Sequence, residues 1–385
     1  MWEVTLEKGL LVKEGKDIKS PALKEKLAYG ALVEELAKEG ERLNYKLKKG
    51  AGPDEGWVSI KTGDKTFMVE KEEEIPADHG GPGGADAPPV EVDTELKAKI
   101  EADAKLKQEE DALLLYVPKY KVFGYPIPDV KFRVFCFHNA GSAESQYTGP
   151  GTPFVTWAKE KKNVEIIAID LPGRDKLIKA KKFTSAVAVV PDLMATLYHK
   201  LTDGVPYAVW GHSMGTWVCY EFLQLARKIG APMPVAAFLN AFPAPHLQWA
   251  DRPWPRSRKM DDKDLRQNLM NWDSGHFTGA GKPVFDSPGW EQIWAPLMRA
   301  DFQIYDEYRF THAGSPKFTF PIHCWHMEGE HFNKPEMIKK WEEWTTGAVD
   351  HTTMKGMGHL TCFYKPDLKK IYFQKVVDNL KKYHP

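Results

Sequence analysis

The stretch AVWGHSMGTW, residues 208–217, places Ser213 at the centre of a Gly-x-Ser-x-Gly pentapeptide. An apolar run precedes the pentapeptide and an amphipathic run follows it. A strand, a tight turn and a helix in that order form a nucleophile elbow, which lifts the serine hydroxyl above the edge of a sheet. Glycine is required at Gly211 and Gly215, because the chain passes close to neighbouring backbone there. We therefore interpret Ser213 as a nucleophile rather than a serine in a chance match.

The same alternation continues on both sides of the elbow. Short apolar runs that read as buried strands alternate with amphipathic runs that read as helices, which favours a mostly parallel sheet with helices on both faces. The strands are expected within 131–140, 163–173, 207–210, 234–242, 321–329 and 350–358, and the helices within 183–201 and 216–230.

Composition divides the chain into three parts. Residues 1–70 contain short alternating runs separated by glycine-containing turns, which predict a small all-β domain with one helical turn near 20–28. Residues 71–92 are rich in glycine, proline and acids, so we expect a flexible linker. Residues 93–385 form the large domain and begin with a helix over 93–115. The long aromatic region 246–312 interrupts the alternation and is expected to form a helical lid or cap.

The charge, the lengths of the apolar runs and the cysteines exclude several classes of function. The formal net charge is zero, so nothing favours nucleic-acid binding. The chain has no apolar run long enough to span a membrane and no recognisable signal peptide. Its four cysteines are scattered, so we expect no metal site and no disulfide framework. An intracellular location, in the cytoplasm or an organellar stroma, fits best, and secretion is not expected.

A serine hydroxyl needs a base, and the base needs an acid to orient it. His359 is the expected base, because it follows a probable strand and a glycine-rich turn near the end of the domain. The acid should lie between the serine and this histidine, after a strand. Glu330 is favoured there, while Glu328 and Asn333 stay open as alternatives. Asp350 is a weaker candidate, because it falls at the start of a strand, the wrong end for the site.

Backbone N–H groups are expected to stabilise the oxyanion of the tetrahedral intermediate. One donor should be Met214, directly after the nucleophile, and Ala140 is the candidate for the other. Five tryptophans of the cap either line an acyl tunnel or form the core of the cap. These are Trp249, Trp254, Trp272, Trp290 and Trp294.

These motifs together resemble those of type II thioesterases, stand-alone enzymes of α/β-hydrolase fold. The resemblance spans about 130–380 and rests on FCFHNAGSAESQY, IIAIDLPGR, WGHSMGTWVCYEF, WAPLMRADFQIYDEYRF and MKGMGHLTCF. By position it matches the family nucleophile to Ser213 and the base to His359. The family aspartate, eleven residues before a tryptophan, matches Glu330 before Trp341. Glutamate in place of aspartate is a departure, as is FHNAGSA in place of a proline and paired glycines.

The resemblance implies hydrolysis of acyl thioesters carried on the phosphopantetheine arm of acyl carrier proteins, in polyketide, non-ribosomal peptide or fatty acid synthesis. It implies no cofactor besides the phosphopantetheine of the substrate. Two other functions stay open: an oxygen-ester hydrolase or acyltransferase of the same fold, and a binding module without activity. The N-terminal part resembles SH3-like modules of dinoflagellate proteins, and docking to a synthase is one role for it.

Overall fold

The computed structural model describes residues 1–71 and 80–385, and internal contacts divide the chain into the units Met1–Pro76 and Ala77–Pro385. Residues 72–79, inside the expected linker, lie outside the described residues. Beyond them, the N–H of Gly83 donates to the carbonyl of Ser315 at 2.8 Å. The flexibility expected of 71–92 stays a prediction.

The first unit is a small antiparallel β structure, which confirms the all-β prediction and is consistent with an SH3-like module. Alternate residues of its strands point inward, so that Val12, Val33, Tyr45 and Val58 are fully buried in its own core. Seven strands form one sheet in the order β3-β2-β6-β5-β4-β1-β9, and β7 and β8 form a separate hairpin. The strands are β1 (Trp2–Val4), β2 (Leu10–Lys13), β3 (Ala22–Leu27), β4 (Leu32–Glu39), β5 (Arg42–Lys49), β6 (Glu55–Ser59), β7 (Lys61–Thr62), β8 (Lys65–Thr66) and β9 (Met68–Glu70).

The helical turn expected near 20–28 is wrong, because this segment contains strand β3. Alanine, leucine, lysine and glutamate favour helices individually. Here β3 pairs antiparallel with β2, and Leu27 lies opposite Leu10 with its side chain fully buried. Burial in a small core outweighs the weak local propensity.

The second unit is built on a six-stranded sheet in which every neighbouring pair is parallel. The strand order is β11-β10-β12-β13-β14-β15. This sheet and its covering helices confirm the α/β-hydrolase fold class. The strands are β10 (Phe132–Phe137), β11 (Val164–Ile169), β12 (Tyr207–His212), β13 (Ala236–Asn240), β14 (Ile322–Met327) and β15 (Val349–Met354).

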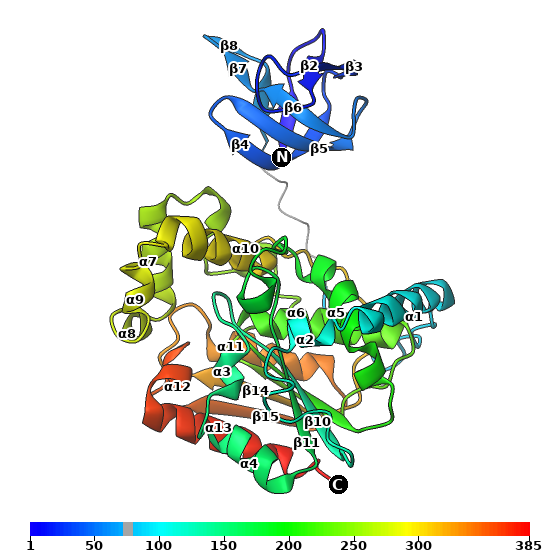
Figure 1. Ribbon diagram of the computed structural model, residues 1–385, viewed down its shortest axis with the longest axis vertical. Coiled ribbons are helices and arrows are strands. Elements are labelled where there is room, and N and C mark those ends of the chain that lie inside the picture. The colour runs from blue at the N-terminus through cyan, green and yellow to red at the C-terminus, as the bar shows by residue number, and fades with distance from the viewer. Residues whose placement is uncertain (72–79) are drawn as a thin grey trace. The chain divides into compact units, whose positions relative to one another are not determined.

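Both faces of this sheet are covered, which explains why its central strands are continuous apolar runs. Along β10, Phe135 and Phe137 join the core on one face, while Val134 and Cys136 join the core on the other. Helices α1, α5 and α6 cover the first face, and α4 and α13 cover the second (Figure 1). The helices are α1 (Thr94–Glu109), α4 (Pro153–Lys161), α5 (Ala186–Leu201), α6 (Met214–Lys228) and α13 (Pro366–Leu380).

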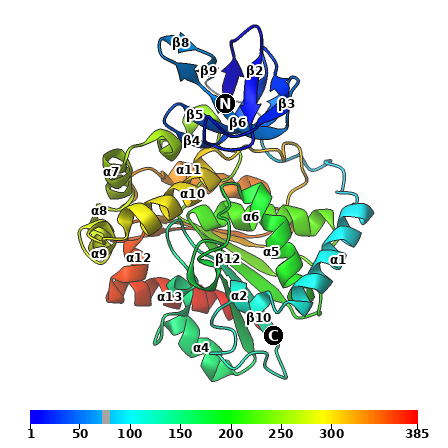
Figure 2. The same ribbon diagram turned by 45° about the horizontal axis from the view of Figure 1, so that its top comes forward.

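The insertion between β13 and β14 is helical, as expected for a cap. Its helix α8 packs against α12, and the two lie together in both views (Figure 2). No helix in the described part of the chain is long and apolar enough to cross a membrane. The helices of the cap are α7 (Asp262–Trp272), α8 (Ser274–Phe277), α9 (Lys282–Phe285), a π-helix (Trp290–Trp294) and α10 (Ala295–Asp306), and α12 spans Thr361–Tyr364.

Candidate active site

Ser213 occupies a strained turn between β12 and α6. Its φ is 55° and its ψ is −132°, a conformation that a residue with a side chain rarely adopts. A Cβ atom at Gly215 would lie 2.1 Å from the carbonyl oxygen of Phe137, and one at Gly211 would lie 2.7 Å from the carbonyl oxygen of Gly215. Both glycines are therefore required by close backbone approach, as the pentapeptide predicts.

Three side chains that are distant in sequence meet at the carboxyl edge of the sheet. His359 Nε2 lies 2.7 Å from Ser213 Oγ, and His359 Nδ1 lies 2.6 Å from Glu330 Oε1. Ser213, Glu330 and His359 follow β12, β14 and β15 respectively, and parallel strands all end at the same edge. A carboxylate only accepts hydrogen bonds, so Nδ1 carries the proton and Nε2 accepts from the serine hydroxyl.

The other candidates for the acid do not contact His359. Glu328 is exposed and accepts the N–H of Gly356 at 2.8 Å. Asp350 lies 3.1 Å from His323 Nδ1, away from the site. Asn333 is buried behind Glu330, where its Nδ2 donates to Glu330 Oε2 at 3.2 Å. The structure brings only Glu330, among these four, to the imidazole of His359.

His212, beside the nucleophile in sequence, points away from the serine hydroxyl. Burial, and next the nearby His359, hold the pKa of His212 well below its ordinary value. The neutral ring donates from Nε2 to the carbonyl of His359 at 2.8 Å, and its Nδ1 accepts from the Tyr372 hydroxyl at 3.1 Å. His212 therefore fixes the backbone at position 359 and is not placed to act as a base on Ser213.

Two backbone N–H groups lie free at the site. Met214 begins α6, so its N–H has no partner within the helix. Ala140 follows β10 and lines the same pocket as Ser213. Neither N–H forms a hydrogen bond to any other residue that the structure describes.

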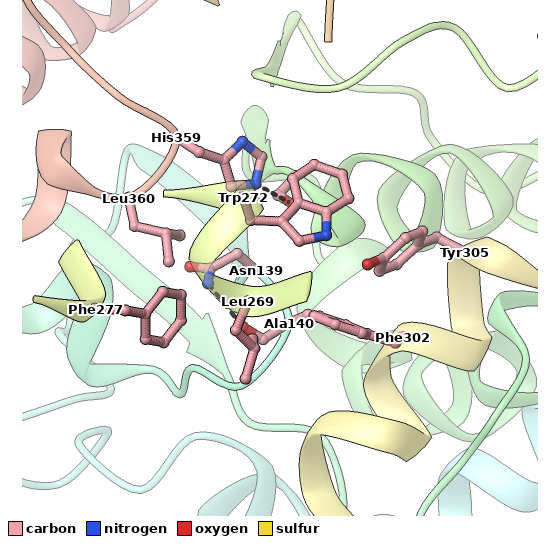
Figure 3. Close-up of a pocket in the computed structure, with 10 residues that line it drawn as sticks. Asn139, Ala140, Leu269, Trp272, Phe277, Phe302, Tyr305, His359 and Leu360 are labelled. Carbon is pink, nitrogen blue, oxygen red and sulfur yellow. Dashed lines mark hydrogen bonds between the residues drawn. The ribbon is translucent and has the colours of Figure 1, made fainter. Parts of the chain in front are cut away.

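A pocket opens at Ser213 and His359. Figure 3 shows the side chains of His359 and Trp272 among those that line it. Apart from Asn139 its remaining walls are mainly apolar: Ala140, Leu269, Trp272, Phe277, Phe302, Tyr305 and Leu360. Trp272 contributes a ring whose centroid lies 4.8 Å from that of His359. A larger groove shares Asn139, Ala140, Phe277 and Leu360 with this pocket.

The cap tryptophans do not share one environment. Trp272 lines the pocket and Trp294 lines the groove. Trp254 packs against other aromatic rings, with its centroid 5.1 Å from that of Phe242, and belongs to the core beneath the cap.

Sequence reasoning missed two buried aspartates that contact the loops of the site. Asp301 stands in the quoted stretch WAPLMRADFQIYDEYRF, but nothing in that stretch assigns it a role. Asp273 follows Trp272 and caps α8. Their contacts are made across the fold, so spacing along the chain gives no signal for them. Within the described residues, no group of three or more His, Cys, Asp or Glu side chains is arranged to hold a metal ion.

Comparison with known proteins shows the family to which this chain belongs. A family model described as "Thioesterase domain" matches residues 132–364, more than half of the 385 residues. The gramicidin S biosynthesis protein GrsT of Aneurinibacillus migulanus is 24% identical over 216 residues, which are 56% of this chain and 77% of that protein.

The probable anguibactin biosynthesis thioesterase AngT of Vibrio anguillarum is 25% identical over 233 residues, covering 58% of this chain and 85% of that one. Among solved structures, the RedJ thioesterase from the prodiginine pathway of Streptomyces coelicolor is similar with a TM-score of 0.53 at 23% identity. That match covers 64% of this chain and 85% of RedJ, and it supports the fold.

Proposed function

Because the chain belongs to the thioesterase-domain family, we propose that it hydrolyses acyl thioesters through a covalent acyl-enzyme on Ser213. The observation that carries this proposal is the unbroken line of contacts from Glu330 through His359 to the serine hydroxyl. Glu330 holds the proton of the imidazole on Nδ1 and stabilises the imidazolium, and His359 is the general base.

In the first step, Ser213 Oγ attacks the thioester carbonyl carbon and its proton passes to His359 Nε2. A bond forms between Oγ and carbon, and the carbonyl oxygen becomes an oxyanion. The N–H groups of Ala140 and Met214 are the proposed donors to it. The carbon–sulfur bond then breaks, and the leaving sulfur takes the proton from the imidazolium.

In the second step, water attacks the acyl-enzyme while His359 Nε2 takes its proton. The bond between carbon and Oγ breaks, and the proton returns to the serine oxygen. The products are a free acid and a thiol. Every proton is carried by a side chain of this protein, so the mechanism needs no cofactor.

The two cavities suit the two halves of an acyl thioester. We assign the apolar pocket at Trp272 and Phe302 to the acyl group next to the carbonyl. The larger groove, which is lined partly by Arg174, Ile178 and Tyr364, is assigned to the thiol side. This groove is larger than the pocket and suits an extended arm, so we extend the proposal to thioesters on the phosphopantetheine of a carrier protein. The relative GrsT is named for gramicidin S biosynthesis, and AngT is named as a probable thioesterase of anguibactin biosynthesis.

The separate core of the N-terminal unit suits a docking module for the same carrier system.

We expect the purified chain to hydrolyse an acyl pantetheine thioester at least about tenfold faster, in kcat/KM, than the matching oxygen ester. A thiol, with a pKa near 8.5, leaves with little help from an acid. The measurement compares the two substrates with one acyl group at one pH. Equal rates, or transfer of the acyl group to an added alcohol, would favour an ester hydrolase or acyltransferase. Binding without turnover would favour a module without activity.

The rim of the groove gives a second prediction, about the carrier arm. The rim residue Ile178 is followed by Lys179, Lys181 and Lys182, of which Lys179 and Lys181 are exposed. We expect charge reversal at Lys179 and Lys181 to raise KM about three- to tenfold for a phosphopantetheine thioester, with a smaller effect at high salt. The matching pantetheine thioester, which has no phosphate, should be unaffected.

The matched control reverses Lys99 and Lys105, two exposed lysines on α1. This double variant changes the net charge equally but leaves the groove intact. An equal rise in KM for both double variants would show a general effect of charge. It would contradict binding of the phosphate at the rim of the groove.

A further inference from the structure

The loop after β10 is attached to the cap through one buried carboxylate. Asp301, on α10, accepts the N–H of Gly141 at 2.7 Å and forms an ion pair with Arg174. The side chains of Asp301 and Arg174 are both at least 95% buried. Gly141 directly follows Ala140, whose N–H faces the oxyanion in the proposed mechanism.

The cap contacts the same loop at a second point. Gly141 has a φ of 71°, and a Cβ atom there would lie 2.3 Å from Sδ and Cε of Met298. Met298 stands three residues before Asp301, so the two side chains leave the same face of α10. Helix α10 therefore contacts Gly141 at two points: Asp301 accepts the Gly141 N–H, and Met298 packs where a side chain at this position would lie.

A second carboxylate of the cap holds the loop on the other side of the site. Asp273 Oδ2 accepts the N–H of Leu360 at 2.7 Å and the N–H of Thr361 at 3.0 Å. Its Oδ1 accepts the N–H of His276, which anchors the carboxylate to α8. The two N–H groups that Oδ2 accepts belong to the two residues directly after His359.

We propose that the cap positions the reacting groups. Asp301 fixes the position of the Ala140 N–H, and Asp273 fixes the position of the His359 imidazole. Neither aspartate lines the pocket or the groove, so both are positioning residues, and the inference rests on the proposed function. Residues 138–144 and 355–360 form neither helix nor strand, so their backbone is held by such side-chain bonds. Hydrogen bonds to a charged acceptor are strong and directional. A cap bonded in this way cannot lift as a unit without releasing both loops.

The test replaces each aspartate by alanine. A displacement of about 1 Å at a reacting group costs roughly a hundredfold in rate. We therefore expect Asp301→Ala and Asp273→Ala each to lower kcat about a hundredfold with KM changed less than about threefold. Asp301→Asn keeps an oxygen that can accept the Gly141 N–H, and should recover most of the lost kcat.

The matched control is Asp306→Ala. Asp306 also lies on α10, is equally buried, and accepts the N–H and hydroxyl of Ser257 at 2.7 and 2.6 Å. Burial raises its pKa to about 7, and its bonds stay within the cap. This variant should lower Tm as the others do, but keep kcat within about twofold.

Hydrogen–deuterium exchange in the full chain tests the inference without a substrate. Amides in 139–145 should exchange faster in Asp301→Ala, and those in 358–362 faster in Asp273→Ala, with neither changed in Asp306→Ala. If the wild-type protein turns over thioesters and all three alanine variants share one kcat, the inference is overturned. Unchanged exchange in both loops overturns it as well. A wild-type protein that turns over no thioester defeats the proposed function, while exchange still reports on the two loops.

Discussion

Replacing Ser213 with alanine is expected to abolish labelling by a serine-directed fluorophosphonate and to lower thioester turnover on the order of a million-fold. The reason is that no other hydroxyl contacts the imidazole of His359 in the described part of the chain. The alanine should fold, since the strain at φ 55° belongs to the turn and not to the hydroxyl. Labelling followed by mass spectrometry, together with single-turnover kinetics, measures both effects.

The control for this variant is Ser274→Ala, which changes an exposed serine at the start of α8. It should label and turn over like the wild-type protein. Persistent labelling of Ser213→Ala at another residue would show that the elbow is not the reactive centre. Loss of labelling with undiminished hydrolysis would contradict the acyl-enzyme.

The parallel core could be predicted from the sequence because its signals are local and agree with one another. The run at Phe132–Phe137 is apolar at every position, as a strand covered on both faces must be, and Gly211 and Gly215 flank a serine between a strand and a helix. Strand β3 could not be predicted, because its residues prefer helix and only pairing with β2 and burial of Leu27 make it a strand.

The site, too, could be predicted only in part. The order of motifs along the chain identified Ser213 as the nucleophile and His359 as the base. It did not identify the acid, because Glu328, Glu330 and Asn333 stand within six residues and the local pattern does not tell which side chain turns inward. The contacts of Asp301 and Asp273 join segments 160 and 87 residues apart. Such contacts depend on how the cap folds back onto the sheet, and no periodicity along the chain records them.

The choice of Glu330 leads to the second large effect. Glu330→Ala should lower kcat about ten-thousandfold, because the imidazole then loses the acceptor that keeps its proton on Nδ1. In the other tautomer Nε2 carries the proton and cannot accept that of Ser213. Glu330→Asp keeps a carboxylate but shortens its reach by one methylene group, so we expect a kcat between those of the alanine variant and the wild-type protein. Steady-state kinetics on one acyl pantetheine thioester compare the three proteins.

Two neighbouring substitutions decide whether the effect belongs to Glu330 itself. Glu328→Gln changes an exposed side chain two residues away and should leave kcat unaltered. Asn333→Ala removes the amide that donates to Glu330 Oε2, and we expect a loss below about tenfold, the scale of a single hydrogen bond. A ten-thousandfold loss in Asn333→Ala beside a mild loss in Glu330→Ala would reassign the role to the amide. A mild loss in all of them would mean that the histidine holds its tautomer without an acid, since His212 already fixes its backbone from the other side.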